Sequence, residues 1–235
     1  MRRGLRIAVF GLVALAAVLA ILLFGAQYAA RQAPAFYRES LAADRAVLEQ
    51  ASDAFLQQAS VLTSDLNRGG EWHAVFTVGQ INGWLAVDLV ENHPGLVPAG
   101  VTEPRVAILD DRLTLAYRAA GGMIEGVVSV EVEVALPEPD QLALRLKRVR
   151  AGTLPLPMGV VIDAVEEAAR QMDLRVTWRQ ANGDPVALIA LAPILADGGK
   201  RIRVEEVYLG EGEVYVAGTT ESATARAATL RRGAR

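Results

Sequence analysis

The first thirty residues constrain this chain more than any other part of it. No charged residue occurs from Ile7 to Ala30, and a helix that crosses a bilayer needs about 20 apolar residues. Arginines precede this run at positions 2, 3 and 6, and basic residues favour the cytoplasmic side of a membrane. We therefore predict a cytoplasmic N-terminus and a transmembrane signal-anchor within residues 1–30. The rest of the chain would then lie outside the cytoplasm, tethered to the inner membrane by this single span.

A cleavable signal peptide is the alternative interpretation of the same run. Such a peptide has an apolar core of about 7–15 residues and small residues before its cleavage site. Here the cuts that follow the core place Phe24, Gln27 or Tyr28 three residues before the cut, where a small residue is preferred. The sequence therefore favours an anchor that stays attached, and leaves open whether it is ever removed.

Charge and cysteine content exclude several classes of protein. The net charge is −3, yet four arginines lie in the last ten residues and three precede the apolar run, so the body between them is more acidic than the total suggests. An acidic body disfavours binding to a phosphate backbone, and we predict no nucleic-acid partner. The absence of cysteine excludes disulfides, thiolate metal sites and a cysteine nucleophile.

Two helices are predicted before the sheet. Residues 31–70 are typical of one juxtamembrane amphipathic helix, which either docks on its own domain or forms a short parallel coiled coil with a second chain. Docking is favoured. Thr77 and Gln80 have capping-box spacing and predict a second helix that reaches Asn92, with Asp88 turned away from the core. Asn82 lies one turn into it, and a solvent or backbone hydrogen bond is favoured there over a ligand contact.

Residues 104–150 alternate with a period of two, which is typical of half-buried antiparallel strands. Asp110-Asp111 and Asn182-Gly183 predict hairpin turns. We therefore predict an α+β fold, in which an N-terminal transmembrane helix is followed by an exported domain over residues 71–217. That domain would contain a long curved antiparallel sheet covered by helices. Residues 218–235 are small, polar or basic and predict a disordered tail.

No catalytic or metal-binding pattern is found. His73 and His93 are the two histidines, and neither has a second ligand at metal-site spacing. Ser129 lies between valines and is most simply a solvent-facing strand residue, and Glu131 and Glu133 are typical of a solvated strand face. The sequence therefore predicts a protein that is not an enzyme and that has no cofactor.

The segment "LPLP" at residues 154–157 suggests a binding site. Its prolines favour an extended backbone that leads into an amphipathic helix, and the simplest interpretation is a rigid connection that lays this helix on the sheet. A more specific hypothesis is that the segment borders an apolar groove with a basic rim, which would suit a lipid with an anionic head group. The proposed ligand residues are Arg148, Arg150, Leu154, Leu156, Val161 and Val165. The alternative function is a structural or assembly protein that docks an envelope partner.

Four segments also carry a family resemblance: "FTVGQINGWLA", "DDRLTLAYR", "GTLPLPMGVVID" and "GDPVALIAL". In this order behind one anchor, they resemble uncharacterised bacterial membrane-anchored envelope proteins of planctomycete type and, more distantly, the YpmS-like family. The resemblance covers about residues 70–217. It implies a membrane-anchored exported domain and no particular activity. By this resemblance the marked positions are Thr77, Asn82, Trp84, Leu154, Pro155, Leu156 and Pro157.

Overall fold

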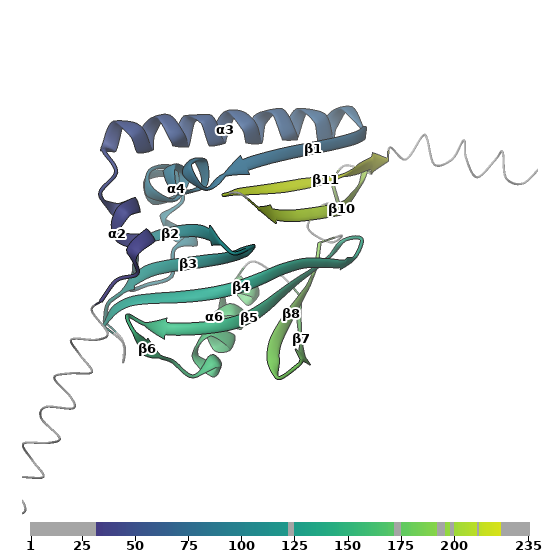
Figure 1. The fold of residues 1–235 in the computed structure, drawn as a ribbon. Coiled ribbons are helices and arrows are strands. Elements are labelled where there is room, and N and C mark those ends of the chain that lie inside the picture. Colours follow the sequence, from purple (N-terminus) through teal and green to yellow (C-terminus); the bar gives the residue numbers. More distant parts are fainter. Residues whose placement is uncertain are drawn as a thin grey trace, which may run out of the picture.

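The computed structural model describes residues 32–121, 125–171, 175–191, 196–197, 200–210 and 212–221. The predicted anchor, residues 1–30, lies outside these ranges. Within them the fold is α+β, as predicted, with two antiparallel sheets and a few helices (Figure 1). None of the described helices has the length and apolarity that crossing a membrane requires.

The larger sheet has seven strands and contains the hairpins that the sequence predicts. Its order is β2-β3-β4-β5-β8-β7, and short β6 pairs with β5. Both central residues of each predicted turn have positive φ, with 49° and 58° at Asp110 and Asp111 and 53° and 87° at Asn182 and Gly183. This geometry is that of the two-residue turns that suit hairpins. The strands are β2 (Val101–Leu109), β3 (Arg112–Ala119), β4 (Gly126–Glu138), β5 (Gln141–Ala151), β6 (Leu154–Pro155), β7 (Val176–Ala181) and β8 (Asp184–Ala190).

The smaller sheet brings the first and last strands of the described chain together. Its order is β1-β11-β10-β9, formed by β1 (Gly70–Thr77), β9 (Ala196–Asp197), β10 (Lys200–Gly210) and β11 (Glu213–Glu221). Because Gly70 pairs with Thr220, the last strand continues four residues into the predicted disordered tail. That part of the prediction is wrong, since small and polar residues such as Thr219 and Thr220 are held in register by β1 and β10.

The predicted juxtamembrane helix is two helices, α2 (Ala35–Leu41) and α3 (Arg45–Arg68). Asp44 has extended backbone geometry and separates them, and Gly69, with φ of 83°, ends α3. Helix α3 docks on its own domain, because the Phe55 ring lies 5.0 Å from that of Phe76 and 5.4 Å from that of Trp84. The structure therefore agrees with docking, the favoured alternative.

The second predicted helix begins as expected and then breaks. Helix α4 (Val78–Ala86) starts with the predicted capping box at Thr77, and Val87 separates it from α5 (Asp88–Asn92), which a 3₁₀ turn at Pro94–Leu96 follows. Asp88 is buried, so the prediction that it turns away is wrong. Its Oδ2 accepts a 2.8 Å hydrogen bond from Trp84 Nε1, because an indole N–H inside a domain needs an acceptor.

The two faces of the larger sheet are covered by different helices. Helix α6 (Met158–Gln171) lies behind β4 and β5 in Figure 1 and closes a core around Val128, Val130, Leu146 and Val149. Helix α2 covers part of the opposite face, where Tyr37 packs with Ala116 and Val127. Neighbouring residues of a strand therefore face different helices, as the alternation of a strand requires.

Candidate functional site

The structure separates the residues that the sequence analysis placed in one site. The core between α6 and the sheet contains Leu156 and two residues of α6 itself, Val161 and Val165. Leu154 is half-buried in the short strand β6. The β4–β5 register pairs Arg148 with Glu131 and Arg150 with Ser129, on the sheet face opposite Val130. The basic rim and the apolar groove therefore do not meet. A bulge in the β4–β5 pairing shifts the register between Glu131 and Val132, so that Val149 joins Leu146 in the core and the neighbouring arginines point to the other face.

The other marked positions have structural roles. Thr77 caps α4, and the side-chain amide of Asn82 accepts a 2.8 Å bond from Val106 N and donates a 2.9 Å bond to Val106 O. This agrees with the backbone hydrogen bond favoured for Asn82. Pro155 and Pro157 are exposed beside the start of α6, where the Leu156 N–H donates a 2.9 Å bond to Val149 O. That bond turns the Leu156 side chain toward the core.

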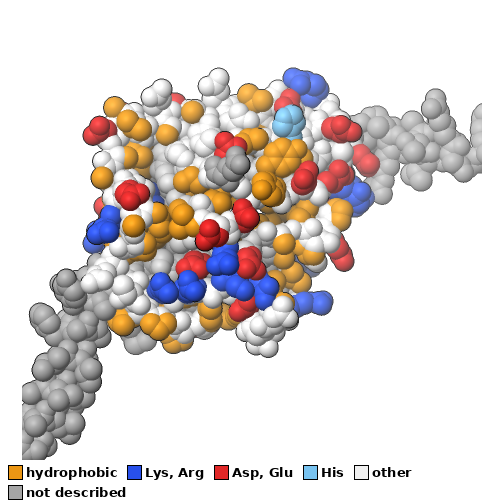
Figure 2. Space-filling view, viewed as in Figure 1, with side chains coloured by type: hydrophobic (Ala, Val, Ile, Leu, Met, Phe, Trp, Pro, Cys, Tyr) orange, Lys and Arg blue, Asp and Glu red, His pale blue; other side chains and the backbone are white. Residues whose placement is uncertain are grey.

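The predicted basic cluster on β5 is largely neutralised by carboxylates. Asp184 lies 2.9 Å from Arg145 Nε and 2.8 Å from Lys147 Nζ, and Glu131 lies 3.1 Å from Arg148 Nη1. Figure 2 shows this face of the molecule, where Lys and Arg side chains alternate with Asp and Glu. Glu131 and Glu133, interpreted as solvated, belong to the same network. Arg150 differs, because no described residue forms an ion pair or hydrogen bond with its guanidinium.

The network lowers the pKa of the Asp184 carboxyl below its ordinary value of 3.8, first through the hydrogen bond from Lys147 and further through the charges of Lys147 and Arg145. Because the folded-state pKa lies below the unfolded one, the pairing stabilises the fold above the unfolded pKa and is lost as pH falls through the folded pKa. We expect ¹³C NMR to show Asp184 titrating below 3.8, and Lys147→Met to move that midpoint upward. A wild-type midpoint at or above 3.8 would contradict this assignment.

A cleft of about 580 Å³ lies between α2 and this face of the larger sheet; we call it the α2 cleft. Its wall is formed by Gln32 to Phe36, and its floor by Thr114, Ser129, Arg148 and Arg150. The wall is held in place because Tyr37 is fully buried and its hydroxyl donates a 2.9 Å bond to Glu103 O. Burial raises the pKa of Tyr37, so this donor stays protonated near neutral pH.

The floor of the α2 cleft contains two residues that the sequence analysis did not assign to a site. Ser129 and Thr114 are 7% and 5% exposed, so the interpretation of Ser129 as solvent-facing is wrong. The only signal in the sequence lies on the polar face of β4. Glu131 and Glu133 have charged side chains there, whereas Ser129, two residues before Glu131, has a small hydroxyl side chain. Which helix covers that position is decided by tertiary packing.

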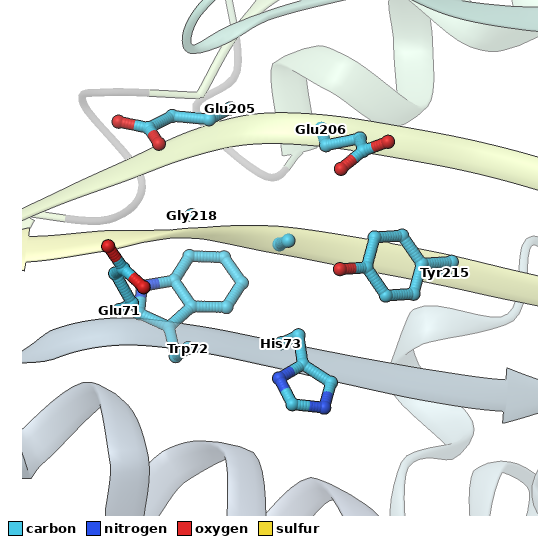
Figure 3. Close-up of a pocket in the computed structure, with 8 residues that line it drawn as sticks. Glu71, Trp72, His73, Glu205, Glu206, Tyr215 and Gly218 are labelled. Atoms are coloured by element: carbon cyan, nitrogen blue, oxygen red, sulfur yellow. The ribbon is translucent and has the colours of Figure 1, made fainter.

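A second cleft, of about 720 Å³, lies on the smaller sheet (Figure 3). His73 of β1 and Tyr215 of β11 stack with ring centroids 6.3 Å apart. The carboxylates of Glu205 and Glu206 point away from each other along β10 in Figure 3. Across the described residues, no group of three or more His, Cys, Asp or Glu side chains is placed to hold a metal ion. The groups that line this cleft therefore do not converge on one point.

The chain matches no family model, no curated protein and no solved structure. The resemblance to bacterial envelope proteins therefore stays a prediction from the four sequence segments.

Proposed function

We propose that this chain is a membrane-anchored envelope protein whose exported domain binds a lipid in the α2 cleft, without catalysis. The observation that carries the proposal is the position of the cleft along the chain. Its wall begins at Gln32, two residues after the uncharged run that ends at Ala30. Two residues span at most about 7 Å, so an anchor that ends at Ala30 would hold the cleft at the bilayer surface.

The lining of the cleft supports an amphiphilic ligand. Phe36 and Leu109 offer apolar surface on one side, and Leu109 is 51% exposed. The floor offers guanidinium and hydroxyl groups on the other. The volume of the α2 cleft falls in the range of about 300–1,000 Å³ that is common for small-molecule sites. An apolar wall beside a polar floor matches a molecule that has an acyl part and a polar head.

A variant that fills the cleft tests this proposal. Ala35 is exposed and lines the wall, so Ala35→Trp should occupy the space without disturbing the core. We expect the full chain, extracted from bacterial membranes in a mild detergent, to carry about one phospholipid fewer per chain when Ala35→Trp is present. Mass spectrometry of an organic extract measures this number. Ala46→Trp is the matched control, because Ala46 is exposed on α3 and lies outside both clefts.

An unchanged lipid count in a folded Ala35→Trp protein would contradict lipid binding in the α2 cleft. The proposal would then move to the docking of an envelope partner. A specific surface favours that second function, since Val47 and Val61 of α3 are 56% and 49% exposed. They are two heptads apart and therefore lie near one line of the helix.

A further inference from the structure

We infer that the floor of the α2 cleft is a subsite for the phosphoryl group of a lipid head group, held by Arg150 together with the hydroxyl of Ser129. This inference rests on the proposed function, because it names the chemistry of the ligand that the cleft would bind. It adds that recognition depends on a charged group rather than on acyl chains alone.

Arg150 supplies a positive charge that the fold does not use. Among the cleft arginines, Arg148 donates two bonds to Glu131, at 3.1 and 3.3 Å, and Arg112 lies 4.0 Å from Glu131 and 3.7 Å from Glu133. Arg150 lines the same cleft and has no such partner within the part of the chain that the structure describes. A guanidinium is a preferred partner for phosphate, to which it donates two parallel bonds.

One hydroxyl lies beside Arg150 on the sheet. Ser129 is the direct cross-strand partner of Arg150, whereas Thr114, on β3, is the cross-strand partner of Glu131 and lies farther from Arg150. Ser129 is more than nine-tenths buried, and its hydroxyl forms no hydrogen bond with another described residue. Its oxygen is not among the described side-chain atoms that are sealed from solvent without a partner, so this hydroxyl can donate to a ligand oxygen in the cleft.

The carboxylates that line the cleft do not oppose an anion at this position. Glu131 is already paired with Arg148. Asp110 lies in the β2–β3 turn, and β2 is three strands from β5, a separation of about 14 Å at the usual strand spacing. Glu39 is exposed on α2, at the wall rather than the floor. Glu39→Gln should therefore leave the affinity for a phosphorylated lipid unchanged or make it tighter.

The experiment compares three soluble probes with the full chain in dodecyl maltoside: dihexanoyl phosphatidic acid, dihexanoylglycerol and inorganic phosphate. Binding is measured by isothermal titration calorimetry, and ³¹P NMR checks the two phosphorus probes. We expect saturable binding of the phosphatidic acid, and affinities at least about tenfold weaker for the other two probes. The uncharged lipid lacks the group that accepts charge-assisted hydrogen bonds, and free phosphate lacks the acyl part that would contact Phe36 and Leu109. Arg150→Gln and Ser129→Ala should each weaken phosphatidic acid binding and leave dihexanoylglycerol binding unchanged. Arg179→Gln is the control, since Arg179 is exposed on β7 and lines neither cleft.

The outcomes separate this inference from the proposed function. Equal affinity for phosphatidic acid and dihexanoylglycerol would overturn the phosphoryl subsite and leave lipid binding standing. Equal affinity for phosphatidic acid and free phosphate would show that the subsite binds phosphate without a lipid, and would overturn the assignment to a lipid head group. Unchanged phosphatidic acid binding in Arg150→Gln would overturn the assignment to Arg150. Absence of binding for all three probes would overturn both the inference and the proposal.

Discussion

Replacing Gly218 with alanine should destabilise the protein by about 3 kcal/mol or more, in the upper range for an overpacked interior. Gly218 lies in the middle of β11, between Trp72 of β1 and Val204 of β10. A Cβ at this position would lie 2.0 Å from the backbone oxygen of Arg203 and 2.6 Å from Cζ2 of Trp72. The Arg203 oxygen belongs to the backbone and cannot move without disturbing the sheet. Urea unfolding of the full chain in detergent, followed by circular dichroism, measures the loss.

Gly159→Ala is the matched control for Gly218→Ala. Gly159 lies in α6, where an added Cβ meets no atom within 4 Å. Alanine is favoured over glycine in a helix by about 0.5–1 kcal/mol, so this variant should be slightly more stable than the wild type. If both alanine variants unfolded within about 0.5 kcal/mol of the wild type, the close approach at Gly218 would not be a feature of the folded protein.

Asn82→Ala should be the second most damaging change, with a loss of about 3 kcal/mol. Asn82 is buried, and its amide forms two hydrogen bonds with the backbone of Val106, one to the N–H and one to the carbonyl. Removing the amide leaves both backbone groups of Val106 without these partners, and each unsatisfied buried group costs about 1–3 kcal/mol. The same urea experiment measures this loss, and protease susceptibility at the α4–β2 contact offers a second measure.

Asn92→Ala separates the effect of burial from that of losing an amide. The Asn92 side chain is exposed and donates one 2.6 Å bond to Asp88 Oδ1, so its removal should cost about 1 kcal/mol, as for a typical single hydrogen bond. A loss at Asn82 no larger than that at Asn92 would show that water reaches Val106 in the variant.

Local sequence signals predicted much of the fold correctly. The Asp110-Asp111 and Asn182-Gly183 turns form where expected because few residues tolerate positive φ, and Thr77 with Gln80 forms the capping box because both partners lie within one turn. The alternation of β4 correctly separated its valines from Ser129 and Glu131, whereas β5 departs from alternation at a bulge, so that Leu146 and Val149 share one core. Such signals act over a few residues, so they do not depend on how distant elements pack.

The errors occurred where distant elements meet. Asp88 is buried because Trp84 needs an acceptor for its indole N–H, and residues 218–221 are ordered because β1, far away in the sequence, pairs with them. The candidate site failed for the same reason. Alternation did not predict the bulge that puts Arg148 and Arg150 on the face opposite Leu146 and Val149, and it did not show that α6 fills the apolar face and leaves the cleft on the other.

By itself, the sequence determined the hairpins and the helix cap, because each follows from residues within a few positions of one another. It also determined the α+β class, from the periodicity of longer segments, and the absence of cysteine chemistry, from composition. It also placed an uncharged run of membrane-spanning length directly before the folded domain. Only the tertiary structure decided that Gln32 to Phe36 form the wall of a cleft over Thr114, Ser129 and Arg150. That arrangement depends on Tyr37 packing against β3 and β4, a contact between segments about 80 or more residues apart, and no local pattern encodes which sheet face a helix will cover.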